Sequence, residues 1–79
     1  MRWWIVKKRE TDDIIEIGFS YENGEPDGIV IYDKKADKLT LTKVPDNCSE
    51  VIPERVCQFI WGLMDDGKLT EKRYWVITG

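Results

Sequence analysis

The stretch of sequence that decides the fold runs from LTLTKV (residues 39–44) into PERVCQFIWGLM (residues 53–64). In the first part apolar and polar residues alternate, which is typical of a half-buried β-strand. In the second part the apolar residues recur at the spacing of one face of an amphipathic helix. They are Val56, Phe59, Ile60, Leu63 and Met64. Pro53 suits a first helical turn and Gly67 suits a C-terminal end, so we predict one helix downstream of a strand.

Outward from this stretch, four more segments predict strands, because they are rich in β-branched and aromatic residues or alternate with a period of two. They are residues 2–8, 14–21, 29–33 and 71–78. The strands that precede the helix are joined by short links. Short links favour an antiparallel meander, because parallel pairs need longer crossovers. The helix then carries the chain from one edge of the sheet to the other.

The predicted fold class is therefore α+β: a five-stranded antiparallel sheet in the order 5-1-2-3-4, with one amphipathic helix packed on one face. The chain has 79 residues, of which 42% are hydrophobic and 34% are charged. This composition is ordinary for a globular domain and excludes a disordered tail. The length predicts a single domain over residues 1–79 with a thin core.

The residue types limit the available chemistry. The chain has no histidine, and its net charge is −3 from 12 basic and 15 acidic residues. The commonest general base and metal ligand is therefore missing. We expect no enzymatic activity, no catalytic residue, no cofactor and no metal site. Cys48 and Cys57 do not form a C-x-x-C pair, and we expect Cys57 to be an inert thiol on the helix and Cys48 to lie in a loop.

The sequence also predicts a location. No apolar run approaches the ~18 residues that a membrane span needs, so we expect no membrane association. Residues 1–9 are basic and lack the long apolar region of a secretory signal. We therefore expect a cytoplasmic protein with both thiols reduced.

The first and last predicted strands are apolar on both faces. Trp3 and Trp4 are adjacent, as are Tyr74 and Trp75, so each pair sends one aromatic side chain to each face. A single helix covers a single face, and the pattern does not say which one. The remaining aromatic surface would amount to several hundred Å², a size that usually marks an interface. We predict an interface drawn from five residues: Trp3, Trp4, Val6, Tyr74 and Trp75.

Three occupants of this surface follow from the sequence. The preferred one is a second copy of the chain or another protein, because small chains commonly gain burial by self-association. A second is a single-stranded nucleic acid, stacked on the aromatic rings and held by nearby basic residues. Those residues are Arg2, Lys7, Lys8, Lys72 and Arg73. The negative overall charge disfavours this alternative. A third is the chain itself, through its loops or through the stems of Lys7, Lys8, Lys72 and Arg73.

Overall fold

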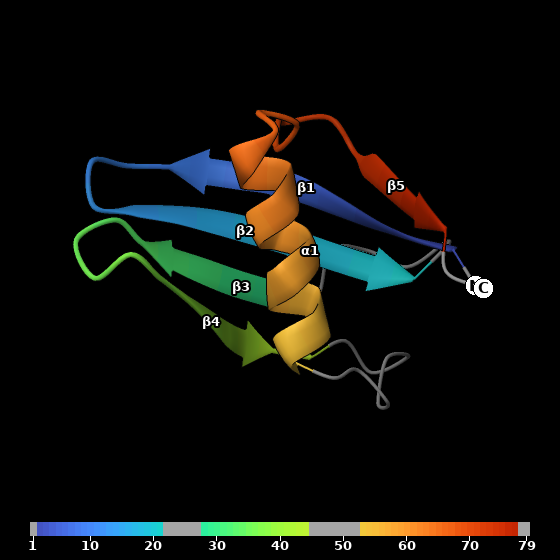
Figure 1. Ribbon diagram of the computed structural model, residues 1–79, viewed down its shortest axis with the longest axis horizontal. Coiled ribbons are helices and arrows are strands. Elements are labelled where there is room, and N and C mark those ends of the chain that lie inside the picture. The colour runs from blue at the N-terminus through green and yellow to red at the C-terminus, as the bar shows by residue number, and fades with distance from the viewer. Residues whose placement is uncertain (1, 22–27, 45–52, 78–79) are drawn as a thin grey trace.

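The computed structural model describes residues 2–21, 28–44 and 53–77. Its elements are β1 (Arg2–Glu10), β2 (Ile14–Tyr21), β3 (Gly28–Asp33), β4 (Lys38–Lys43), α1 (Pro53–Asp65) and β5 (Tyr74–Ile77). The strands form one antiparallel sheet in the order β4-β3-β2-β1-β5 (Figure 1). This confirms the predicted fold class and strand order, including the pairing of the last strand with the first.

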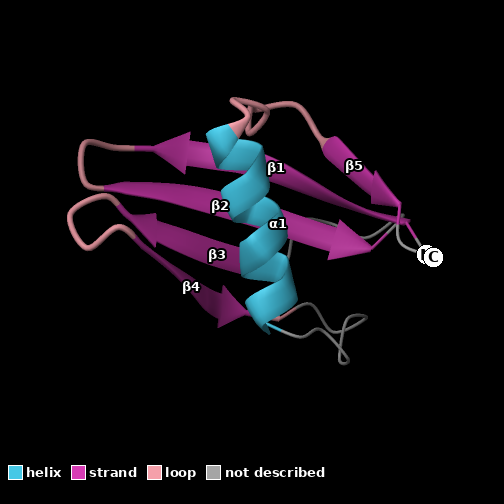
Figure 2. Cartoon of the chain, viewed as in Figure 1, coloured by secondary structure: helices cyan, strands magenta, loops and turns pink. Residues whose placement is uncertain are grey.

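The helix α1 lies across one face of the sheet, from the β4 side toward β1 (Figure 2). Its buried side chains are Val56, Ile60 and Leu63, which belong to one core cluster with residues of β1, β2, β3, β4 and β5. Ile5, Ile17 and Val30 lie at the centre of that cluster with no exposed surface. The predicted helical stripe is therefore the stripe that packs on the sheet, and Phe59 lies at its margin, 40% exposed.

The helix ends as its sequence predicts. Gly67 has a φ of 69°, which glycine adopts without strain. The Gly67 N–H donates to the Met64 carbonyl at 3.2 Å and the Lys68 N–H donates to the Leu63 carbonyl at 2.8 Å. This pair of bonds is a Schellman motif, which satisfies carbonyls that the end of a helix would leave without partners.

Gly28, at the start of β3, is needed for a close approach rather than for an unusual backbone angle. It lies opposite Phe19 in the β2–β3 register. A Cβ atom at this position would lie 2.5 Å from two atoms of the Phe19 ring. The absence of a side chain therefore lets the buried Phe19 ring lie directly over the β3 backbone.

The last strand is shorter than predicted, because it begins at Tyr74 and not at Glu71. The Thr70 hydroxyl accepts a hydrogen bond from the Lys72 N–H at 3.2 Å, which bends the chain just before the strand. The Thr70 carbonyl accepts a bond from the Lys7 N–H at 2.8 Å. The segment that precedes β5 is therefore fixed to β1 by one backbone bond and not by a continuous ladder.

Candidate interaction surface

The sheet divides the predicted interface residues between its two faces. Trp3 and Tyr74 face the helix and belong to the core or pack against it. Trp4 and Trp75 lie opposite each other in the β1–β5 register, and alternation along the strands places them on the other face with the half-buried Val6. The five residues therefore do not form one patch.

On the face away from the helix, Trp4 is covered rather than presented. It is only 1% exposed. The guanidinium carbon of Arg73 lies 4.1 Å from the centroid of a Trp4 ring, and the Trp75 ring lies 6.5 Å away at an angle of 59°. A guanidinium over an indole is a favourable cation–π contact. This is the covering by a basic side chain that the sequence left open as an alternative.

The aromatic surface that remains accessible lies on the β5 side of the molecule. Trp75 on β5 and Phe59 on α1 are each 40% exposed. Phe59 packs edge-on against Trp3, with ring centroids 5.3 Å apart, so its position is fixed by the core. A groove of about 470 Å³ runs between α1 and β5. Its lining residues are Gln58, Phe59, Gly62, Leu63, Asp66, Tyr74, Trp75 and Val76.

Gly62 explains why this groove is open, and it is the part of the site that sequence reasoning missed. Apart from its chain neighbours and the nearby backbone of its own helix, no atom lies within 4 Å of the place where a Cβ of Gly62 would be. A glycine inside a helix costs about 1 kcal/mol relative to alanine, so its presence in an otherwise regular helical pattern is a signal of a local role. The second missed signal is Phe59, which the helical spacing assigned to the buried stripe.

The two edges of the sheet differ in charge. The sequence of β5 is Tyr-Trp-Val-Ile, with no ionisable acid or base among its side chains except the weakly acidic tyrosine. The other edge, β4, carries exposed Lys38 and Lys43. Charged residues on an edge strand oppose pairing with another chain, because a second strand would have to approach and desolvate them. The β4 edge is therefore protected by charge and the β5 edge is not.

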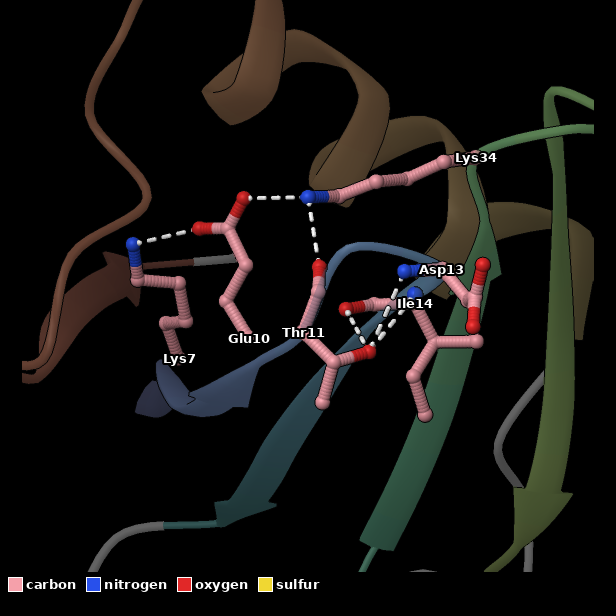
Figure 3. A network of polar contacts seen from close by, with 6 residues as sticks. All are labelled: Lys7, Glu10, Thr11, Asp13, Ile14 and Lys34. Carbon is pink, nitrogen blue, oxygen red and sulfur yellow. Dashed lines mark hydrogen bonds and ion pairs between the residues drawn. The ribbon is translucent and has the colours of Figure 1, made fainter.

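A third stretch of edge, the end of β1 that extends beyond β5, has its own protection. The β1–β2 register shifts between Lys7 and Arg9, which marks a bulge at this point. The bulge brings Glu10 to the same face as Lys7, and their side chains form an ion pair at 3.1 Å (Figure 3). Lys34 pairs with the same carboxylate at 2.7 Å. A bulge with charged side chains turns an edge away from pairing.

The Glu10 charge cluster includes Lys7, one of the five basic residues predicted to hold a nucleic acid. The hydrogen bonds from Lys34 and Lys7 hold the pKa of Glu10 below its usual range. Lys7 is thus partnered by an acid, and Arg73 lies on Trp4. Lys8 and Lys72 are exposed, while the side chain of Arg2 lies outside the described residues. Of the predicted aromatic stacking platform, Trp75 is the accessible indole.

A second groove, of about 600 Å³, lies on the β4 side of the helix, lined by residues 38–44 with Glu54 and Cys57. Cys57 is a free thiol, half-buried against the core. Burial, with a smaller effect of Glu54, raises the pKa of this thiol. A thiol with a raised pKa is a poor nucleophile, because the thiolate is the reactive form. Cys48 lies outside the described residues.

Two further observations concern only the residues that the structure describes. No helix among them is long and apolar enough to cross a membrane. No three His, Cys, Asp or Glu side chains in residues 2–21, 28–44 and 53–77 are grouped so that they could hold a metal ion. Comparison of the chain with known protein families, with curated proteins and with solved structures finds no match.

Proposed function

We propose that this chain is a non-enzymatic protein-interaction module that self-associates, and that its binding surface is the β5 edge with the adjoining α1–β5 groove. The observation that carries the proposal is the exposure of Trp75 and Phe59, which both line a groove that borders an uncharged edge strand. The predicted cytoplasmic location is part of the proposal, and the free Cys57 thiol is compatible with a reducing compartment.

The exposed rings set the strength that such an interaction can reach. An aromatic side chain buries about 150–250 Å², so 40% of each ring leaves about 60–100 Å² for a partner. Four rings from two copies would contribute about 6–10 kcal/mol at 25 cal/mol per Å². Association costs about 4–15 kcal/mol in lost freedom of motion, which offsets most of this gain. We therefore propose a weak, concentration-dependent dimer rather than an obligate one.

The test is the mass in solution, measured by sedimentation over a range of concentrations. For the native chain we expect the mass to rise from monomer toward dimer. Trp75→Ala and Phe59→Ala each remove one accessible ring and should shift the midpoint to higher concentration, by about tenfold for a loss of 1.4 kcal/mol.

The matched control is Val44→Ala, because Val44 is 42% exposed and lines the groove on the opposite side of the helix. Its association should equal that of the native chain. A native chain that stays monomeric near millimolar concentration would refute the proposed function. An effect of Val44→Ala as large as that of Trp75→Ala would refute the proposed surface.

A further inference from the structure

We infer that the partner at this surface is a second copy whose β5 pairs antiparallel with β5, so that Trp75 of one chain lies directly opposite Trp75 of the other. The inference rests on the proposed function above and specifies its geometry. The two five-stranded sheets would join at their β5 edges into one continuous sheet around a two-fold axis.

The β5 edge is suited to pairing with a second copy of itself. No described strand pairs with the outer side of β5, which ends the sheet order. An antiparallel pair around a two-fold axis presents the same patch twice, so an edge used in this way must be compatible with itself. The β5 edge satisfies this condition because it brings no like charges together. At the β4 edge, pairing of two copies would place lysines near lysines.

The faces to which the β5 side chains point restrict the register of a β5–β5 pair. Tyr74 and Val76 belong to the helix side, and Trp75 lies on the other face. In one continuous sheet with both helices on the same face, directly opposite residues must point to the same face. A pairing of Trp75 with Val76 is therefore excluded. Among registers that pair at least three residues of β5, those that remain place 75 opposite 75 or 76 opposite 76.

The exposed surface of Trp75 favours the register with 75 opposite 75. Val76 is 8% exposed and has little surface left to bury, whereas Trp75 is 40% exposed. With 75 opposite 75, the two accessible indoles meet across the axis, and aromatic pairs directly opposite each other are among the more stabilising cross-strand pairs. In the same register Tyr74 lies opposite Val76 of the second copy, on the helix side beside the groove.

The experiment is a charge exchange at position 75, in the full chain. Trp75→Lys and Trp75→Glu alter an exposed side chain, so both variants should fold, which circular dichroism checks. Each variant alone places like charges opposite each other and should dimerise at least about tenfold more weakly than the native chain. An equimolar mixture places Lys opposite Glu, and its association should recover by about tenfold at low salt. The recovery should disappear in 1 M salt, where charges are screened beyond about 3 Å.

The control is the same exchange at the other exposed position, with Val44→Lys mixed with Val44→Glu. No change in association is expected from it. A native dimer that Trp75→Ala weakens, but whose charge variants do not complement each other in the mixture, would overturn the 75-to-75 register and leave the proposed function standing. A native chain that never dimerises would remove both.

Discussion

The two outer strands of this sheet avoid uncontrolled pairing by different means. The β4 edge is six residues long and carries Lys38 and Lys43. The Tyr32 hydroxyl of β3 donates a hydrogen bond at 2.5 Å to Asp37, which lies in the turn between β3 and β4. The β5 edge is four residues long, carries no lysine or carboxylate, and presents Trp75. Charge protects the β4 edge, whereas β5 carries no such charge and is limited in pairing by its shortness. The comparison shows that a short edge strand such as β5 can remain accessible to a partner without charged side chains to protect it.

The largest expected effect comes from removing the buried indole of Trp4, which packs against β5. Trp4→Ala deletes a buried indole that contacts both Trp75 and Arg73. Truncation of a buried tryptophan typically costs about 3–5 kcal/mol, so the midpoint of urea unfolding should fall sharply. The contrast between the two edges should weaken, because β5 would lose one of the contacts that hold it against β1.

The matched variant is Trp75→Ala, which removes an indole that is already 40% exposed. We expect it to cost no more than about 1.5 kcal/mol, within the range of ordinary point substitutions. Equal losses of unfolding free energy in the two variants would contradict the expectation that the buried Trp4 contributes more to stability than the exposed Trp75.

An intermediate effect is expected at the charged edge. The double variant Lys38→Thr, Lys43→Thr makes the β4 edge resemble the β5 edge in charge. Stability should change by about 0.5 kcal/mol or less, because both residues are exposed. Association should increase, and species larger than a dimer should appear in sedimentation because two edges then accept a second chain.

Removal of two exposed lysines away from the edges, with Lys35→Thr and Lys68→Thr, makes the same change in net charge. This control should leave the mass distribution unchanged. If both double variants form larger species, net charge and not edge protection governs the association.

The smallest effect is expected at the bulged end of β1. The pKa of Glu10 is lowered first by the hydrogen bond from Lys34 and then by the bond from Lys7. A lowered pKa in the folded state means that this carboxylate stabilises the fold above its ordinary pKa and loses that contribution as the pH falls through the folded value. Carboxyl chemical shifts followed by NMR against pH should show the lowered pKa directly.

Lys34→Ala should return the pKa of Glu10 toward its usual value, and Lys35→Ala, at the neighbouring exposed lysine, should not. The effect on unfolding should be slight, because exposed ion pairs contribute little. An unchanged Glu10 titration in Lys34→Ala would contradict the assignment of the Lys34 hydrogen bond as the main cause of the lowered pKa.

The order of the strands could be predicted from the sequence because it depends on link lengths and on one change of period. The choice of face could not, because Trp3 with Trp4 and Tyr74 with Trp75 offer an aromatic ring to either side. The helix decides between them through Val56, Ile60 and Leu63, which pack with Trp3 and Val76. That choice is a property of the packed core and not of any single strand.

The candidate surface was predicted only in part, again for physical reasons. Trp75, one of the five predicted interface residues, is 40% exposed, and its place in an interface stays a prediction. The covering of Trp4 depends on Arg73, whose side chain comes from the far end of the chain. The groove beside Phe59 is also lined by Gly62, where no side chain fills the space. The helical spacing of apolar residues does not distinguish a residue that borders a groove from one that is buried beneath the helix.

The position of Arg73 has a consequence for proteolysis. Its guanidinium lies on the Trp4 indole, and the bond that follows it leads directly into β5. A protease specific for arginine must take that guanidinium into its own pocket, which requires Arg73 to leave Trp4 and the start of β5 to separate from β1. The rate of cleavage after Arg73 therefore measures how often this edge of the folded sheet opens.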